Sequence, residues 1–444
     1  MTTRLFVHSP SEVPDAPTIA RQIPEFERYG ERALLLASQG DVVCVAREVD
    51  ERYLSFLDSL EIGPRRDDIV VIEGVLPGAG ISARLIRDPD SLDRVIRRLG
   101  GSESLVVCPF FTTRDALAVG RALSQRLSRP VRVEGGPPGL VLRLHDKSAA
   151  RALAGSLGIP VAPGEVVRTA TPGGGSHQDV SAIRRAIERW SGATGHVIVR
   201  GSSGSSGSSI FTTRSGDIEG MLHAIGERRD NSVYLVEPLF EASASPNVEI
   251  VVEPGIPLSR HVGVTEQVLD SALVYKGSIH PSRATRVPQM VQDSLEIAAW
   301  MRRRGFTGRV GFDFVEHAGT GYGPGHFLTE INPRINGASY PLALLGRLAG
   351  LARRRAAPAP AAFRTGYVRV RTRDLGELMR LSRSLLYDPA RAEGLVFYTV
   401  GALRLGKVGI VCLGRTRRTA EEVREQFVHL AGARHPATTP VEVS

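Results

Sequence analysis

The chain has 444 residues and a formal net charge of +9 at pH 7, and its length predicts about three packed units rather than one domain. No apolar run is long enough to span a bilayer and no signal peptide is recognisable, so we expect a cytoplasmic protein without a membrane partner. The three cysteines stand apart in apolar contexts, which favours free thiols and excludes a zinc knuckle. The arginines are scattered and rarely interleaved with aromatic residues, so we expect anionic small ligands and no nucleic-acid partner.

An α/β domain is expected over residues 1–140. Apolar runs at 32–37, 42–45 and 105–108 alternate with helix-like segments, a pattern typical of a small sheet covered by helices. The cluster of glycine and proline at 135–139 marks the end of this domain.

The rarity of lysine singles out a few basic positions. Lysine occurs only at Lys147, Lys276 and Lys407, and arginine fills the other basic positions. A compact ammonium and a planar guanidinium are not interchangeable, so these lysines are candidates for sites that require an ammonium. Lys147 precedes a helix-like stretch that runs to Leu157. The alternative, an exposed lysine without a role, stays open.

A Gly/Ser tract at 201–209 follows the apolar run 196–200 and precedes a second strand-like run at 210–213. By composition alone the tract is typical of a flexible interdomain linker. Its two strand-like flanks favour a hairpin with a long tip, whose backbone N–H groups and hydroxyls can surround phosphate oxygens. Arg200, Ser203 and Ser206 are the candidate phosphate ligands of this hairpin.

Two further strands are expected at 233–240 and 247–252. The first is an apolar run that contains Glu237 and Leu239, and the second alternates with Glu249 on one face. The segment 261–286 that follows has polar residues at turn-like positions and is the candidate substrate-binding region, with Glu266 as one acid that could pair with a guanidino group.

Acidic and amide side chains mark the strands expected at 308–314 and 327–334. Glu330 and Asn332 are two residues apart and therefore share a face of their strand. With Asp313 they form a set of hard oxygen ligands suited to Mg²⁺. Arg334 continues the face, where a guanidinium can hold a phosphoryl group or a developing oxyanion. Arg309 either reaches the same phosphate or substrate or is a surface arginine of an edge strand.

The C-terminal part begins after a Pro/Ala-rich linker at 353–362. Strands are expected near 397–400 and 408–413, and a helix near 419–428. This pattern predicts a small α+β domain over residues 363–444, with the motifs above lying in a central domain over residues 141–352.

These motifs resemble those of the ATP-grasp superfamily, ligases that join a carboxylate to an amine or thiol through an acyl phosphate. The resemblance implies an α/β and α+β multidomain protein, in which an ATP-grasp fold follows a Rossmann-like pre-ATP-grasp domain and precedes the small C-terminal domain. It also implies roles for the residues. Two Mg²⁺ ions, with Mn²⁺ as a substitute, are held by Asp313, Glu330 and Asn332, and Arg334 stabilises the acyl phosphate.

The resemblance further implies how ATP is bound. Lys147, Arg200, Ser203 and Ser206 hold the phosphates, Glu237 and Leu239 meet adenine, and Glu249 binds the ribose. Arg200 departs from the family pattern, which has a lysine at that position.

The implied function is an ATP-dependent carboxylate–amine ligase of natural-product biosynthesis, such as a peptide ligase that joins an amino acid to a peptide N-terminus. Its partners are then a small carboxylate, for example a guanidino-bearing amino acid, and an amine or peptide acceptor. A non-catalytic ATP-binding regulatory protein and another ATP-grasp activity, such as a carboxylase subunit, stay open as alternatives. The oligomeric state is also open, with a homodimer as one alternative.

Overall fold

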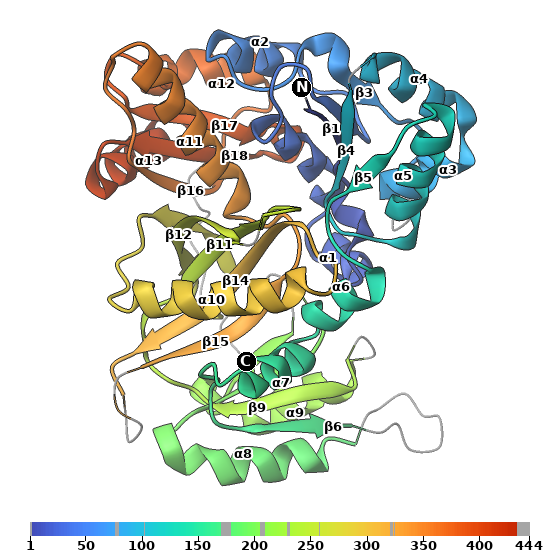
Figure 1. Ribbon diagram of the computed structural model, residues 1–444. Coiled ribbons are helices and arrows are strands. Elements are labelled where there is room, and N and C mark those ends of the chain that lie inside the picture. The colour runs from blue at the N-terminus through green and yellow to red at the C-terminus, as the bar shows by residue number, and fades with distance from the viewer. Residues whose placement is uncertain are drawn as a thin grey trace.

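The computed structural model of the chain describes residues 2–75, 80–101, 103–169, 179–204, 209–228, 231–256, 258–319, 323 and 325–432. In Figure 1 the N-terminal and C-terminal segments lie side by side at the top. A large sheet with α10 (Val287–Arg302) crosses the middle, and a smaller sheet with α8 (Ser181–Thr194) lies at the bottom.

The N-terminal segment forms a five-stranded parallel sheet in the order β3-β2-β1-β4-β5. β2 and β4 are apolar and almost wholly buried, as strands covered by helices on both faces usually are. The runs at 42–45 and 105–108 are strands as expected, whereas the run at 32–37 lies in the 3-10 helix η2 and just after it. The strands are β1 (Thr2–Val7), β2 (Val42–Val45), β3 (Ile69–Val71), β4 (Ser104–Pro109) and β5 (Val131–Val133). The helices are η1 (Pro10–Glu12), α1 (Ala16–Gln22), η2 (Phe26–Leu35), α2 (Glu51–Ser59), η3 (Arg66–Asp68), α3 (Gly80–Arg87), α4 (Pro89–Leu99), α5 (Arg114–Arg126) and α6 (Pro138–His145).

The lower sheet is antiparallel, in the order β6-β9-β7-β8. β7 (Val197–Gly201) and β8 (Ile210–Thr212) pair with each other, so the Gly/Ser tract is the loop of a hairpin and not an interdomain linker. α7 (Lys147–Ser156) begins where the Asp146 carboxylate accepts a hydrogen bond from the backbone N–H of Ala149, a typical N-cap. The other elements of this layer are β6 (Glu165–Arg168), η5 (Thr213–Ser215), α9 (Ile218–Gly226) and β9 (Val233–Pro238).

The large sheet has nine strands in the order β10-β14-β11-β12-β13-β16-β18-β17, and β15 pairs with β14 along the edge opposite β11. Its central strands are β10 (Ala242–Ala244), β11 (Pro246–Val252), β12 (Arg260–Leu269), β13 (Tyr275–His280), β14 (Gly308–His317) and β15 (Gly325–Asn332), and α11 (Ser339–Arg354) follows them. Asp313 in β14 lies opposite Asn247 of β11 on one side and Glu330 of β15 on the other. This register brings the predicted acidic side chains together.

The C-terminal strands extend the same sheet. β16 (Ala362–Arg369) pairs with β13 and with β18 (Lys407–Gly414), and β17 (Gly394–Thr399) pairs with β18. The helices of this part are α12 (Leu375–Leu381), η6 (Arg383–Leu385), η7 (Gly401–Leu405) and α13 (Arg417–Ala431). The predicted linker at 353–362 spans the end of α11 and the start of β16, and the division of the chain into domains stays a prediction.

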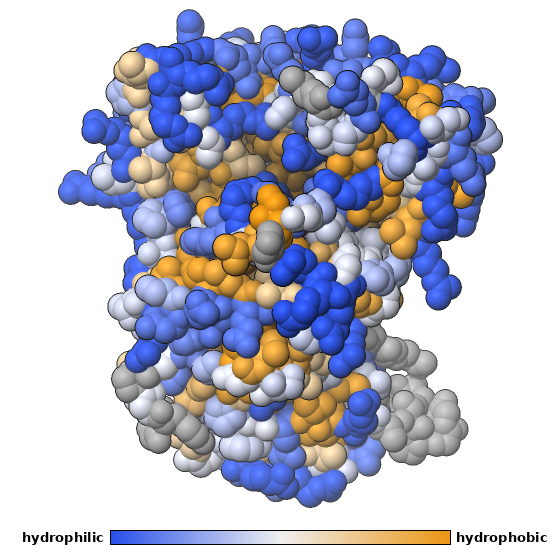
Figure 2. Space-filling model, viewed as in Figure 1, coloured by the Kyte–Doolittle hydropathy of each residue, from blue (hydrophilic) through white to orange (hydrophobic). Residues whose placement is uncertain are grey.

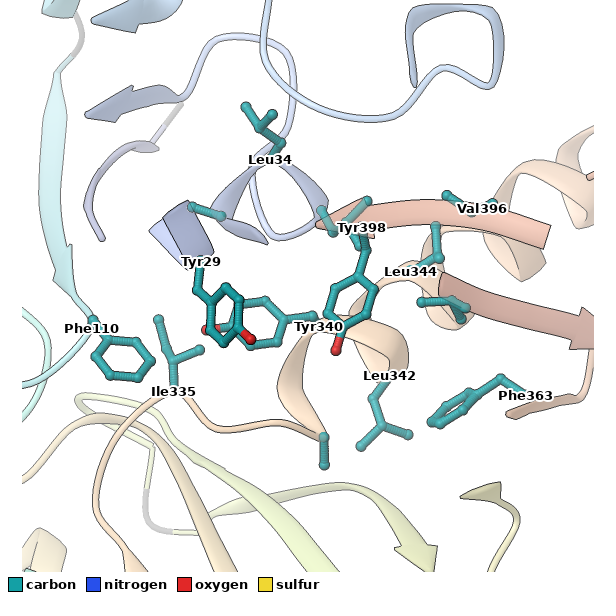
Figure 3. Packing of buried hydrophobic residues seen from close by; sticks show 14 of the residues in the cluster. Tyr29, Leu34, Phe110, Ile335, Tyr340, Leu342, Leu344, Phe363, Val396 and Tyr398 are labelled. Atoms are coloured by element: carbon teal, nitrogen blue, oxygen red, sulfur yellow. The ribbon is translucent and has the colours of Figure 1, made fainter. Parts of the chain in front are cut away.

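One hydrophobic core joins the upper parts of the molecule. Its members include residues of η2, α11, β16 and β17, and Figure 3 shows Leu34, Tyr340, Phe363 and Val396 among them; the same core continues into the strands β11, β14 and β15. Hydrophilic side chains cover most of the face in Figure 2, and hydrophobic ones gather in patches across its middle. In the described part of the chain, no helix is both long and apolar enough to cross a membrane. The cysteines Cys44, Cys108 and Cys412 are buried and unbridged.

Candidate active site

A cavity of about 1330 Å³ lies between the lower sheet, the large sheet and the upper segments. Eight residues expected from the sequence to bind ATP, metal or the reacting groups line it, and they are Lys147, Arg200, Glu237, Leu239, Asp313, Glu330, Asn332 and Arg334. They come from elements that are far apart in the sequence. The cavity therefore gathers most of the predicted site.

Asp313 stands at the centre of the acidic group. Its Oδ1 accepts a hydrogen bond from Asn247 Nδ2 (2.6 Å), and its Oδ2 accepts one from Asn332 Nδ2 (3.0 Å). Burial and the neighbouring Glu330 charge raise the pKa of the Asp313 carboxyl to about 7, despite opposing contributions from Asn247 and Arg334. Two neighbouring carboxylates repel each other, which is a reason for a further cation to bind here.

The donor set fits Mg²⁺ that is shared with phosphate. Asp313, Glu330 and Asn332 offer two carboxylates and an amide, all hard oxygen ligands. The buried Oδ1 of Asn247 has no hydrogen-bond partner among the described residues, so a further oxygen is available beside Asp313. Within that part of the chain, no three or more His, Cys, Asp or Glu side chains form a metal cluster. A site made of two carboxylates and one amide would leave coordination positions for phosphate and water, as Mg²⁺ sites usually do.

Arg334 is an incompletely paired cation on the same cavity. Its Nη1 donates to the Ile335 carbonyl oxygen (3.2 Å), and its buried Nε has no partner in the part of the chain that the structure describes. The guanidinium carbon lies 5.5 Å from the ring centroid of Phe110, a residue of the N-terminal segment. A half-buried guanidinium with an unused donor is suited to an anionic ligand.

Lys147 joins the hairpin to the acidic group. Its Nζ donates to the Gly204 carbonyl oxygen (2.5 Å) and lies 3.4 Å from Glu330 Oε1. Ser202 at the hairpin base donates to Asp146 Oδ2 (2.5 Å), which fixes the hairpin beside α7. An ammonium between the hairpin loop and a carboxylate lies where it can bind phosphate oxygens.

The hairpin residues proposed as phosphate ligands are only partly described. The backbone N–H of Ser203 donates to Asn231 Oδ1 (2.8 Å), and Ser203 is not among the residues that line the cavity. Ser206 lies outside the described residues, so its predicted role stays a prediction.

Glu237 is held by two arginines. Its Oε2 accepts from Arg200 Nη2 (2.5 Å) and Nε (3.0 Å), and its Oε1 accepts from Arg151 Nη1 (2.6 Å). Arg200 Nη1 also donates to the Thr329 carbonyl oxygen (2.9 Å), which ties the lower sheet to β15. Leu239 lines the cavity, but its backbone N–H already donates to the His196 carbonyl oxygen (2.8 Å). Leu239 therefore offers its carbonyl oxygen and side chain, and not its N–H, to a ligand.

Glu249 and Arg309 are not among the residues that line the cavity, so the ribose role of Glu249 and the two alternatives for Arg309 stay predictions. Glu249 is fully buried, and it accepts hydrogen bonds from Ser339 Oγ (2.6 Å), Asn336 Nδ2 (2.8 Å) and Arg309 Nη1 (3.3 Å). The physical reason is the register, because Glu249 lies opposite Gly311 and the missing side chain leaves room for Asn336 there. Burial raises the pKa of the Glu249 carboxyl, and Arg309 opposes this shift.

Two domain families match parts of the chain. Residues 30–125 match the family described as Pre ATP-grasp domain, and residues 380–426 match the family described as PGM1 C-terminal domain. No curated protein matches the sequence.

Solved structures match nearly the whole chain. N5-carboxyaminoimidazole ribonucleotide synthetase from Thermus thermophilus has 12% identity and a TM-score of 0.53, over 98% of this chain and 99% of that one. N5-carboxyaminoimidazole synthase from Aspergillus clavatus, in complex with ADP and 5-aminoimidazole ribonucleotide, has 14% identity and a TM-score of 0.54, over 97% and 98%. Biotin carboxylase from Campylobacter jejuni, in complex with an ATP analogue, has 12% identity and a TM-score of 0.55, over 97% and 91%. The chain has the ATP-grasp fold. At these identities the likeness establishes the fold alone.

Two residues that contact the predicted site, Arg151 and Asn247, were not predicted from the sequence. Arg151 lies one turn after Lys147 on α7, where it meets Glu237. Asn247 shares a strand face with Glu249, and only the register of β11 against β14 decides which of the two meets Asp313. The spacing of Arg151 from Lys147, and of Asn247 from Glu249, could have indicated both residues. The register of the strands cannot be predicted from the sequence alone.

Proposed function

We propose that the protein is an ATP-dependent carboxylate–amine ligase that forms an amide through an acyl phosphate. The observation that carries the proposal is the pairing of Asp313 with Glu330 across β14 and β15, with Lys147 and Arg334 on the same cavity. Two acids and two cations of this kind match the needs of phosphoryl transfer, which depends on positioning and charge stabilisation and not on a protein nucleophile.

Each side chain has a role in this proposal. Asp313, Glu330 and Asn332 hold Mg²⁺, which offsets the charge of the ATP phosphates when it is bound. Lys147 binds phosphate oxygens beside the hairpin. Arg334 offsets charge on the transferred phosphoryl group and on the tetrahedral intermediate. The substrate carboxylate attacks the γ-phosphorus with release of ADP, and the amine then displaces phosphate from the acyl carbon.

We further propose that the acceptor amine is a peptide N-terminus and the donor an amino acid. The order of segments resembles that of the peptide ligase of pheganomycin biosynthesis. The cavity supports this proposal, because it continues beyond the acidic group to residues of the N-terminal and C-terminal segments and has room for a second substrate. Glu266 also lines the cavity and accepts hydrogen bonds from the backbone N–H of Ser245 (2.8 Å) and from Ser282 Oγ (2.6 Å).

A carboxylase is the second candidate. The likeness to N5-carboxyaminoimidazole ribonucleotide synthetase and biotin carboxylase over nearly the whole chain favours it at the level of the fold. The two functions differ in the carboxylate that is activated. A carboxylase requires bicarbonate for ADP release, and an amide ligase requires an organic acid and an amine.

The test is ADP release from Mg·ATP across amino acids, each alone, with short peptides, or with bicarbonate. The ligase predicts turnover only when an acid and an amine are both present, and loss of that turnover in Glu330→Ala. Glu219→Ala is the matched control, because Glu219 is 74% exposed on α9 and should leave turnover unchanged. Turnover with bicarbonate in place of the acid supports the carboxylase. ATP binding without turnover under every pairing supports a regulatory protein.

A further inference from the structure

The end of the cavity away from the lower sheet is built around Arg32. Arg32 lies in η2 and lines the cavity together with four tyrosines. The tyrosines come from η2, α11, β16 and β17, and they are Tyr29, Tyr340, Tyr367 and Tyr398. Figure 3 shows the rings of Tyr29, Tyr340 and Tyr398 close together where these segments meet. We call these five residues the Arg32 cluster.

The guanidinium of Arg32 is surrounded by aromatic faces. Its central carbon lies 3.9 Å from the ring centroid of Tyr29, and 5.1, 5.6 and 5.7 Å from those of Tyr398, Tyr367 and Tyr340. Nε donates to Thr399 Oγ1 (3.2 Å), and Nη2 donates to the Tyr367 hydroxyl. These neutral partners fix the plane of the guanidinium, but they leave donors of its fork unused.

Arg32 itself has no counter-charge among the described residues, although Tyr29 of the cluster donates a hydrogen bond to Glu25 Oε1 (3.2 Å). None of their carboxylates lies within 4.0 Å of the Arg32 nitrogens, and the neighbouring Glu31 accepts its hydrogen bond from the Gly401 N–H (2.7 Å) instead. Burial raises the pKa of the Tyr29, Tyr340 and Tyr367 phenols, so these groups stay neutral. A half-buried cation without a paired anion is suited to a ligand that supplies the anion.

The other charged side chains at this end of the cavity are also cations. The charged lining residues contributed by η2, β16, β18 and α13 are all cations, namely Arg32, Arg369, Lys407 and Arg424. Two of these cations are paired with carboxylates, Lys407 with Glu25 (2.6 Å) and Arg424 with Glu421 (3.2 Å). An apolar wall faces this end, made of Val13, Ile19, Ile23 and Phe26. The surroundings therefore suit a molecule with an anionic group and an apolar side chain.

We propose that the Arg32 cluster binds the non-reacting carboxylate of the acceptor, an amino acid or short peptide with an apolar C-terminal residue. This inference rests on the proposed function only in calling the ligand an acceptor. A carboxylate is planar and matches the two-pronged guanidinium. Tyr340 lies beside Arg32, whose guanidinium carbon is 5.7 Å from its ring centroid, and Arg334 lines the same cavity. The acceptor thus extends from its amine near Arg334 to its carboxylate at Arg32, while the donor carboxylate is activated at the acidic group.

The test is calorimetric binding of Ala-Phe and of its C-terminal amide, with and without Mg²⁺ and a non-hydrolysable ATP analogue. The wild-type protein should bind the acid about 10-fold or more tightly than the amide, because a charge-assisted pair is lost in the amide. Arg32→Gln should bind the two dipeptides equally, and Arg32→Lys should retain only part of the preference. Arg97→Gln, an exposed arginine on α4, is the matched control and should keep the full preference.

Several outcomes overturn the inference. Equal binding of acid and amide by the wild-type protein does so, as does an acid preference that survives in Arg32→Gln. The inference is also overturned if the protein binds neither dipeptide, or if it binds only inorganic phosphate in an Arg32-dependent way. The wild-type comparison stands even where Arg32→Gln fails to fold. None of these measurements needs turnover, so ADP release with equal binding refutes only the Arg32 site, and acid-selective binding without ADP release refutes only the ligase.

Discussion

Breaking the buried ion pair between Arg200 and Glu237 should cost far more stability than breaking an exposed pair of the same kind. Arg200 has 8% of its side chain exposed and makes three hydrogen bonds, two to Glu237 and one to the Thr329 carbonyl oxygen. Arg200→Gln removes the charge and leaves the buried Glu237 with Arg151 as its remaining cation. Breaking a buried pair typically costs ~3–5 kcal/mol, and the second cation reduces this to about 2–4 kcal/mol of unfolding free energy.

Arg189→Gln is the matched control. Arg189 pairs with Glu165 at 2.7 Å in the same layer, but 62% of its side chain is exposed, so its loss should cost less than about 1 kcal/mol. Urea unfolding can be followed by the fluorescence of Trp190, which packs against the core of this layer, in a Trp300→Phe background. Equal losses of unfolding free energy in Arg200→Gln and Arg189→Gln, within about 0.5 kcal/mol, would refute the reasoning, because burial would then not decide the cost.

Two further predictions concern a buried acid and a close approach. Burial raises the pKa of the Glu12 carboxyl from 4.5 to about 8, so between these values the folded protein binds a proton that the unfolded chain releases, and stability falls as pH rises. At pH 8.5 the free energy of unfolding in urea should therefore be higher for Glu12→Gln than for the wild type by about 4–5 kcal/mol, at about 1.4 kcal/mol per pH unit, and at pH 5 the two should be similar; a difference that does not vary with pH would contradict this. In Gly311→Ala the new Cβ would collide with Asn336 Nδ2 and lie 2.9 Å from Asn247 Nδ2, so we expect a loss of about 1–3 kcal/mol in urea unfolding together with reduced ADP release. Gly346→Ala in α11 has open space and should be neutral or stabilising, and an equal loss in both variants would show that the close approach at Gly311 is not the cause.

The sequence predicts the parts of the site that depend on local pattern. The strands that carry Asp313 and Glu330 were recognisable from their apolar neighbours, and the hairpin from the strand-like runs that flank a Gly/Ser tract. The helix-like stretch after Lys147 is the helix α7. These features need only the periodicity and composition of short segments.

The features that the sequence did not predict depend on register and on distant pairing. Asn247 and Glu249 share a strand face, and only the alignment of β11 with β14 places Asn247 beside Asp313 and Glu249 opposite Gly311. Arg309 pairs with that buried Glu249 for the same reason. The joining of the C-terminal strands to the large sheet through β13 and β16 links segments more than 80 residues apart, which no local pattern encodes.

The transfer of ¹⁸O from the donor carboxylate to the released phosphate tests the central claim most directly. The experiment uses the acid and amine that together support ADP release, with both carboxylate oxygens of the acid labelled. An acyl phosphate predicts one ¹⁸O in each released phosphate, because the carboxylate oxygen that attacks the γ-phosphorus leaves with it. Phosphate without the label would contradict the account, because it would mean that water and not the substrate carboxylate receives the phosphoryl group.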